Sequence, residues 1–186
     1  ILLIINLFTI KMCIMKYMKP KRINVVLDLD NTLICARHKK MKKKPDFEMT
    51  VGHEHFYVYK RPGLDRFLMD LFEHAKSVSV WTSATKEYCN QIVKNIFTNE
   101  EKKKLKFVWS RNKTVNRNGG MFLKDMSKVF RKHKTCKPHN TLLLDDNRDH
   151  LLVSPENVLP IRAWVSNPSD CELKKFSTIL KQSRLS

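Results

Sequence analysis

A short, mostly apolar run that ends in two acidic residues is the feature that most constrains this chain. Residues 23–27 read Ile-Asn-Val-Val-Leu and lead directly into Asp28-Leu29-Asp30-Asn31-Thr32-Leu33. Runs of β-branched residues and leucine are typical of a parallel strand that is covered on both faces. Side chains two residues apart on a strand share a face, so Asp28 and Asp30 are predicted to point the same way. Two carboxylates at such a short separation need a bound metal ion or a shared proton.

Size and charge narrow the classes of protein. The chain has 186 residues, 42% of them hydrophobic, which suits one globular domain with a proper core. The formal net charge of +18 predicts attraction to polyanions, without choosing between nucleic acid, phosphoproteins and acidic peptides. The lysine-rich run 39–44 is predicted to be a solvated loop, with a nuclear-localisation signal or a polyanion contact as alternatives.

The cysteines indicate a reducing compartment. There are five of them, an odd number, and none forms a C-x-x-C pair. This pattern favours neither a disulfide framework nor a zinc ribbon. We therefore expect an intracellular protein, nuclear or cytoplasmic.

The first residues are set apart from the predicted domain. Residues 1–10 are strongly apolar, but Lys11 and Lys16 interrupt the pattern before the roughly 20 residues that a membrane-spanning helix needs. No membrane span is therefore predicted, and no signal peptide is recognisable. We expect residues 1–18 to lie outside the fold, either ahead of a true start at Met12 or as a short hydrophobic anchor. Residues 19–186 are expected to form the single domain.

The remaining pattern alternates strands with helices, which predicts an α/β fold with a mostly parallel sheet. A hairpin is predicted around Gly52, the stretch 99–104 is expected only to end a helix, and Asn118-Gly119-Gly120 is expected to form a turn. Ser169-x-x-Glu172 is predicted to be the capping box of the last helix. The predicted strands are 23–27, 77–81, 105–109, 141–144 and 158–161, and the predicted helices carry Leu64 to Ala75, Tyr88 to Phe97, Met126 to Phe130 and Leu173 to Leu180.

Polar residues follow three of these strands. Asp28 and Asp30 follow the first, Thr82 and Ser83 follow the strand 77–81, and Asp145-Asp146 follow the strand 141–144. Ligands of α/β sheets bind at the carboxyl ends of the strands, so these residues are expected to converge there.

The order of these segments resembles the haloacid dehalogenase superfamily, whose four motifs correspond to Asp28 to Thr32, Thr82, Lys124 and Asp145-Asp146. More closely, the chain from about residue 22 to 182 resembles the NLI-interacting-factor phosphatases, which include the carboxy-terminal-domain phosphatases of RNA polymerase II. The segments that carry this closer resemblance are Arg61 to Leu64, Val80 to Ala84, Ser110-Arg111, Lys124 to Ser127 and Leu144 to Asn147.

The resemblance implies a Rossmannoid three-layer sandwich with a mostly parallel central sheet, a small β-hairpin insertion and no large cap domain. The sequence departs from the family pattern in two places. Asn31 stands where the family usually has an acid, and Asn147-Arg148 replaces a small residue and proline. The first departure bears on substrate preference more than on the chemistry.

Residue chemistry suggests a role for each candidate. Asp28 is the predicted nucleophile, because an ionised carboxylate can attack a phosphoryl group when a cation offsets their repulsion. Asp30 is the predicted general acid and base. Mg²⁺ is the predicted cofactor, held by Asp28, the Asp30 backbone carbonyl and either Asp145 or Asp146.

Four further residues are candidates for binding the substrate phosphate. Thr82 and Ser83 offer hydroxyl groups, and Lys124 offers a point charge where negative charge develops. Arg111 is a weaker candidate. Taken singly, a Thr after a strand is usually a helix cap and a Lys usually faces solvent.

These assignments predict a Mg²⁺-dependent phosphatase that acts through an aspartyl-phosphate, most readily on phosphoserine or phosphothreonine in proteins. One alternative is a nucleic-acid end (3′) phosphatase on the same fold, for which the net charge of +18 is an asset. Another is a non-catalytic phosphoprotein-binding module, but the full set of acids with Thr82 and Lys124 argues against it.

Overall fold

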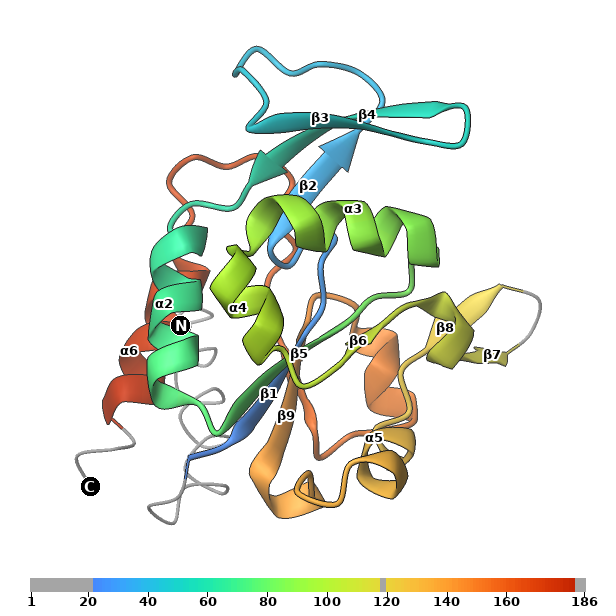
Figure 1. Ribbon diagram of the computed structural model, residues 1–186, viewed down its shortest axis with the longest axis vertical. Helices are drawn as coiled ribbons and strands as arrows, with labels where there is room; N and C mark the ends of the chain where they lie inside the picture. The colour runs from blue at the N-terminus through green and yellow to red at the C-terminus, as the bar shows by residue number, and fades with distance from the viewer. Residues whose placement is uncertain (1–21, 118–119, 183–186) are drawn as a thin grey trace, which may run out of the picture.

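The structure is a computed structural model that describes residues 22–117 and 120–182. Its centre is a five-stranded sheet in the order β10-β9-β1-β5-β6, and every pairing in it is parallel. The predicted α/β class and mostly parallel sheet are therefore confirmed (Figure 1). The strands of this sheet are β1 (Asn24–Leu27), β5 (Ser77–Trp81), β6 (Val108–Trp109), β9 (Thr141–Asp145) and β10 (Val158–Pro160).

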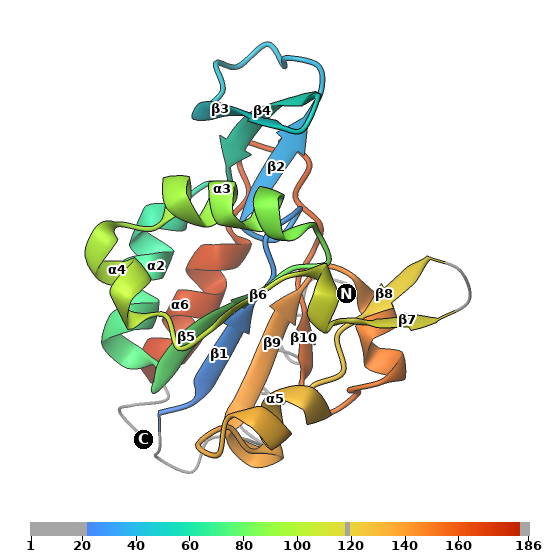
Figure 2. The ribbon, with the colours of Figure 1, turned by 45° about the vertical axis from the view of Figure 1, so that its right-hand side comes forward.

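Helices cover both faces of the sheet, which gives three layers (Figure 2). They are α2 (Leu64–His74), α3 (Lys86–Ile96), α4 (Asn99–Lys104), α5 (Ser127–Lys132) and α6 (Glu172–Gln182), with short 3₁₀ turns at η1 (Arg111–Lys113), η2 (Pro138–Asn140) and η3 (Arg148–Leu152). The predicted helices at α2, α3, α5 and α6 are confirmed.

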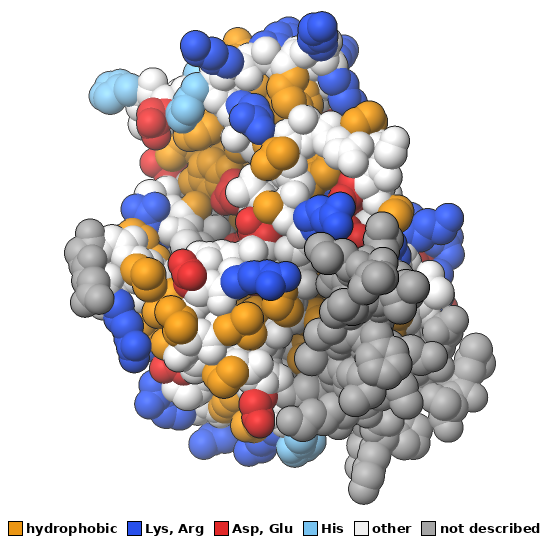
Figure 3. Space-filling view, turned by 180° about the vertical axis from the view of Figure 1, so that it is seen from behind, with side chains coloured by type: hydrophobic (Ala, Val, Ile, Leu, Met, Phe, Trp, Pro, Cys, Tyr) orange, Lys and Arg blue, Asp and Glu red, His pale blue; other side chains and the backbone are white. Residues whose placement is uncertain are grey.

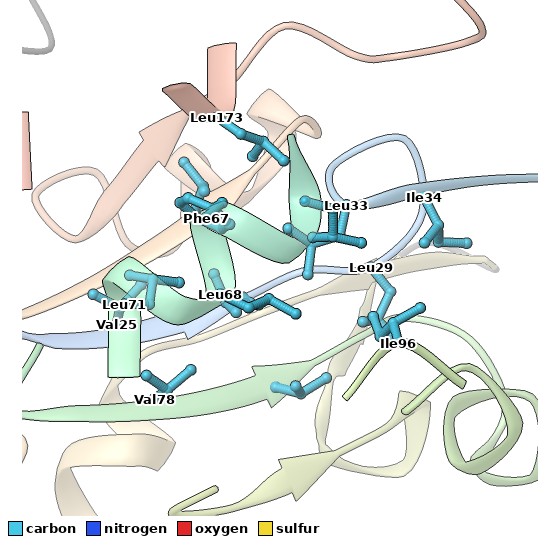
Figure 4. Close-up of a cluster of buried hydrophobic side chains, with 14 of the residues drawn as sticks. Val25, Leu29, Leu33, Ile34, Phe67, Leu68, Leu71, Val78, Ile96 and Leu173 are labelled. Atoms are coloured by element: carbon cyan, nitrogen blue, oxygen red, sulfur yellow. The ribbon is translucent and has the colours of Figure 1, made fainter. Parts of the chain in front are cut away.

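Alternation along the central strands explains the two cores. In β1, Val25 and Leu27 pack with the large cluster beneath α2, α3 and α6, whereas Val26 packs with the smaller cluster beside α5. Phe67 and Leu71 of α2 lie over Val25 in the large cluster (Figure 4). Because both faces of β1 are buried, its residues 25–27 are apolar in succession rather than alternately polar.

A second sheet lies at the carboxyl end of the central strands. It is antiparallel, in the order β2-β4-β3, with β2 (Ile34–Arg37), β3 (Phe47–Val51) and β4 (Glu54–Lys60). The hairpin predicted around Gly52 is confirmed, and Gly52 has the positive φ of 59° that suits glycine in a tight turn. The insertion is one strand larger than predicted, because β2 also pairs with β4.

The lysines of the run 39–44 are exposed in the loop between β2 and β3, as predicted.

Across the described residues there is no large cap domain, in agreement with the prediction. The small hairpin of β7 (Val115–Arg117) and β8 (Met121–Leu123) leads to Lys124, but the turn predicted at residues 118–120 falls mainly on residues that the structure does not describe.

Two predictions about helix ends are wrong. The stretch 99–104 forms the separate helix α4, which begins with a capping box between Thr98 and Glu101. At the start of α6, the Glu172 amide donates to Asp170 Oδ1 at 3.2 Å, whereas the predicted capping box has this amide donate to Ser169.

None of the helices in the described ranges has both the length and the apolar character to cross a bilayer. The predicted exclusion of residues 1–18 from the fold concerns residues outside those ranges.

Candidate active site

The carboxyl ends of the central strands bring the predicted site residues together. Asp28 follows β1, and its amide donates to the Leu144 carbonyl of β9 at 3.0 Å. Thr82 follows β5, and its amide donates to the Trp109 carbonyl of β6 at 3.0 Å. A pocket opens there, lined by Asp28, Asp30, Asn31, Thr82, Ser83, Ala84, Lys124, Asp145, Asp146, Asn147, Arg148 and His150.

Acidic side chains are also visible near the middle of the rear face of the molecule, below the insertion (Figure 3). Lys and Arg side chains lie around them, with hydrophobic and other side chains between, and cover the top of the insertion. A surface rich in basic side chains attracts a phosphorylated ligand electrostatically.

Lys124 lies at the bottom of the site, between two carboxylates. Its side chain is 1% exposed, and its Nζ donates to Asp28 Oδ1 and to Asp145 Oδ2, the latter at 2.6 Å. Burial alone would lower the pKa of Lys124, but the charges of Asp145 and Asp28 outweigh it and raise the pKa. Lys124 therefore carries a fixed positive charge, and the interpretation of Lys124 as a solvent-facing lysine is excluded.

The two carboxylates on either side of Lys124 have different pKa shifts. Burial and the charge of Asp145 raise the pKa of Asp28 despite the nearby ammonium. Burial also acts to raise the pKa of Asp145, but Lys124 and a hydrogen bond from His150 outweigh it and lower that pKa. A further positive charge beside Asp28 would favour its ionised form.

Three carboxylates are close enough to hold a cation. Oxygen atoms of Asp28, Asp145 and Asp146 lie within 4.8 Å of one another, and they are the one such group found among the described residues. Asp146 is oriented by Thr32, whose hydroxyl donates to its Oδ1 at 3.2 Å and accepts from its amide at 3.1 Å. Carboxylate oxygens are the donors that hard divalent cations prefer, so the group suits such an ion.

Asp30 is oriented by Tyr88 of α3. The Tyr88 hydroxyl donates to Asp30 Oδ1. Burial raises the pKa of Asp30, although this hydrogen bond acts in the opposite direction. A carboxyl group with a raised pKa is suited to hold a proton and to donate it. The sequence predicts Tyr88 only as a residue of a helix; its single signal is a hydroxyl group on an otherwise apolar helical face.

The segment after β5 presents hydroxyl groups to the pocket. Thr82 Oγ1 accepts a hydrogen bond from the Ala84 amide at 3.0 Å, so its own proton can be donated to a bound oxygen. Ser83 Oγ donates to the Phe122 carbonyl at 3.2 Å, which ties this segment to β8. Ser83 lines the pocket, but its hydroxyl proton is already donated to the Phe122 carbonyl.

Arg111 does not line the pocket, unlike the other predicted phosphate-binding residues. Its Nε donates to the Ser83 carbonyl at 2.7 Å, and its guanidinium group stacks over the Phe122 ring at 4.6 Å from the centroid. Arg111 therefore braces the Thr82-Ser83 segment from its outer side.

The loop that follows Asp28 and Asp30 is held by a buried arginine. Arg61 is 1% exposed and donates to the Thr32 carbonyl at 3.0 Å. It also pairs with Asp170, at 2.8 Å from Nε and 2.9 Å from Nη2. Asn31 has a left-handed φ of 56°, a conformation that asparagine tolerates, and its carbonyl accepts from the Trp164 amide at 2.7 Å. In the sequence, Arg61 is marked only as part of a family motif, and no pattern marks Asp170.

His150 is a further residue whose role the sequence did not predict. It is 1% exposed on η3, its Nε2 lies 3.3 Å from Asp145 Oδ2, and its Nδ1 accepts from the Lys124 amide at 3.4 Å. It thus orients both members of the Lys124–Asp145 pair. No sequence signal distinguished it from other histidines.

Comparison with known proteins agrees with this geometry. The chain is 31% identical over 153 residues to a CTD small phosphatase-like protein 1 of Caenorhabditis elegans, covering 80% of this chain but 29% of that protein. It is 30% identical over 176 residues to a putative CTD phosphatase-like protein, 355R, of Invertebrate iridescent virus 3, covering 84% of this chain and 94% of that protein.

The fold matches that of Fcp1, described as an essential RNA polymerase II CTD phosphatase, with a TM-score of 0.67, 17% identity and coverage of 94% of this chain and 64% of that one. The sequence profile of the NLI interacting factor-like phosphatases matches residues 23–186. The chain therefore belongs to the NLI interacting factor-like phosphatase family.

Proposed function

We propose that this protein is a Mg²⁺-dependent phosphatase that removes phosphate from phosphoserine or phosphothreonine in proteins through an aspartyl-phosphate. The observation that carries the proposal is the buried Lys124 between Asp28 and Asp145, with Asp30 beside them in one pocket. The desolvation cost of a buried ion pair can exceed its Coulombic gain, so stability alone does not account for Lys124, whereas a role for its charge in the reaction does.

The first half of the reaction forms a bond to Asp28. Its carboxylate oxygen attacks phosphorus as the bond to the seryl or threonyl oxygen breaks, and Asp30 gives its proton to that leaving oxygen. Lys124 and the Thr82 hydroxyl stabilise the charge on the transferring phosphoryl oxygens.

The second half regenerates the enzyme. Asp30, now ionised, takes a proton from a water molecule whose oxygen attacks phosphorus. The bond between phosphorus and Asp28 breaks, Asp28 returns as a carboxylate, and inorganic phosphate leaves. Asp30 again carries the proton that it needs for the next turnover.

The residues that would hold Mg²⁺ are Asp28, the Asp30 backbone carbonyl and one or both of Asp145 and Asp146. When bound, the ion supplies positive charge that reduces repulsion between Asp28 and the phosphate. Asp146 already has one oxygen fixed by Thr32, which limits how it can approach an ion.

A protein substrate is favoured over a small one because no cap covers the pocket in the described ranges. Several relatives are named CTD phosphatases, and a human carboxy-terminal domain RNA polymerase II polypeptide A small phosphatase 2 is 28% identical over 165 residues, covering 87% of this chain and 57% of that protein. We accordingly propose phosphoprotein substrates and an intracellular location, with basic loops such as residues 39–44 tuning affinity for acidic partners.

The test is a panel of serine- and threonine-phosphorylated peptides and of 3′- and 5′-phosphorylated oligonucleotides, assayed with Mg²⁺ over a range of salt. We expect a higher kcat/KM for the peptides at physiological salt, because an oligonucleotide contact through several phosphates weakens steeply with ionic strength. Asp28→Asn should be inactive, whereas Asp149→Asn, at an exposed acid on η3, should retain activity. If oligonucleotide 3′-phosphates are the better substrate across that salt range, the nucleic-acid end phosphatase replaces this proposal.

A further inference from the structure

A second pocket, which the proposed reaction does not use, is lined by residues of β6, of η1 and of α5. Its volume is about 450 Å³. We call it the basic pocket; it is lined by Trp109, Asn112, Lys113, Lys128, Arg131 and Lys132.

Its charge is uncompensated. Four of the six lining residues are cationic and none is acidic. None of the four takes part in the ion pairs found among the described residues. Like charges gathered in one concave site repel one another, and an anion placed among them relieves that repulsion. The pocket is therefore suited to an anionic ligand.

Two of the cations are held in place. Lys128 Nζ donates to the Lys113 and Thr114 carbonyls, each at 3.1 Å, which leaves one of its three N–H groups free. Lys132 Nζ lies over the Trp109 ring, 5.9 Å from its centroid. Because these side chains are already ordered, ligand binding costs less free energy for immobilising them.

The basic pocket adjoins the active site. Trp109 lines it, and the Trp109 carbonyl accepts from the amide of Thr82, which lines the active-site pocket. Lys128 stands four residues after Lys124 along the chain. Arg111, the neighbour of Asn112 in the basic pocket, donates to the carbonyl of Ser83, which lines the active-site pocket. These links make one extended ligand the natural candidate for occupying both pockets.

We infer that the basic pocket binds a second phosphorylated residue of the peptide whose first phosphoresidue is in the active site. This inference rests on the proposed phosphatase function. The alternative occupant, single-stranded nucleic acid, is less well suited. Binding sites for single-stranded nucleic acid follow its backbone along a groove and stack its bases on exposed aromatic rings. Here Trp109 is 7% exposed and packs against Trp81 and Phe107, so it offers no free face to a base.

The experiment compares one phosphoserine peptide with a series that carries a second phosphoserine at different spacings on either side. We expect the best doubly phosphorylated peptide to have a kcat/KM about tenfold higher than the single one, through KM. The pocket variant Lys128→Gln/Arg131→Gln should lose this preference and keep its rate on p-nitrophenyl phosphate.

The control is Lys102→Gln/Lys104→Gln, which removes the same charge from α4, on the far side of β6 from α5 (Figures 1 and 2). This control variant should keep the preference for the doubly phosphorylated peptide, because we attribute the preference to the basic pocket and not to the overall positive charge of the protein. Equal efficiency for single and double peptides at every spacing, or a preference that survives in the pocket variant, would overturn the inference while leaving the phosphatase function intact.

Binding is measured separately with the Asp28→Asn variant and fluorescent peptides. The doubly phosphorylated peptide should bind about tenfold more tightly, and the added pocket substitutions should abolish the difference. An unphosphorylated oligonucleotide that displaces the peptide from the pocket more strongly than a diphosphopeptide would assign the pocket to nucleic acid instead. Absence of hydrolysis of every phosphate ester by the wild type would contradict the proposed function, and this binding comparison would still decide the role of the pocket.

Discussion

Tyr88 donates its hydroxyl to Asp30 Oδ1 although the two residues are 58 positions apart, one on α3 and the other in the loop after β1. The contact fixes one oxygen of the predicted general acid and leaves the other for the leaving group. It also favours the ionised form of Asp30, opposing the effect of burial on its pKa. Tyr88 is thus a positioning residue for the proton transfer.

Tyr88→Phe is expected to lower kcat about tenfold, the effect of losing one well-placed hydrogen bond. The pKa of Asp30 should rise further, so the alkaline limb of the kcat/KM profile should move to higher pH. Steady-state kinetics across pH measure both effects.

The matched control is Tyr59→Phe, whose hydroxyl is bonded to the Met41 amide at 2.8 Å in the insertion. An equal loss in both variants would mean that the change acts through the stability of the fold. An unshifted pH profile in Tyr88→Phe would contradict the assignment.

Asp170 supports the catalytic loop through Arg61, and this support depends on pH. Burial acts to raise the pKa of Asp170, but the hydrogen bond and charge of Arg61 outweigh it, so the pKa is lowered in the folded state. The stabilisation is therefore present above the unfolded-state pKa, near 3.8, and is lost as pH falls through the folded-state value.

Asp170→Asn should reduce the free energy of unfolding by about 2 kcal/mol at pH 7, since a hydrogen-bonded charge pair is replaced by a neutral acceptor. The difference from the wild type should narrow as pH falls below 4, which is about the unfolded-state pKa. Urea denaturation from pH 7 down to the lowest pH at which the wild type folds measures it. A difference that stays constant over this range would show that Arg61 does not depend on the charge of Asp170.

Metal removal tests the carboxylate group directly. Chelation should abolish turnover and Mg²⁺ should restore it, whereas Ca²⁺, which is larger and less strict in geometry, should support it poorly. Mg²⁺ should also raise the melting temperature of the wild type, because it binds the folded state, and should do so less in Asp28→Asn. Full activity in excess chelator would exclude a metal-dependent reaction.

The sequence predicted the central sheet because its strands are buried on both faces and read as short apolar runs bounded by polar residues. The convergence of Asp28, Thr82 and Asp145 followed from strand direction alone. The predictions failed for elements whose sequence has no apolar pattern. The helix α4 has no buried residue, so only its capping box could have revealed it.

The supporting contacts of the site could not be predicted for a different reason. Tyr88 and Asp30 are brought together by the packing of α3, and Asp170 lies 109 positions from Arg61. Such pairs depend on tertiary structure, and no local rule of spacing or propensity encodes them. The strand β2 was missed because only the first two of its four residues are buried and only its pairing with β4 defines it.

Asp28 is proposed to carry the phosphoryl group during turnover, and a trapping experiment can locate that group. The enzyme is mixed with substrate, quenched in acid and treated with borohydride, which reduces an acyl phosphate on aspartate to homoserine; peptide mass spectrometry then locates the product. We expect homoserine at position 28 in the wild type and in Asp149→Asn, and at no position in Asp28→Asn. Conversion at Asp30, Asp145 or Asp146 instead, or active enzyme in which no aspartate is ever converted, would contradict the account.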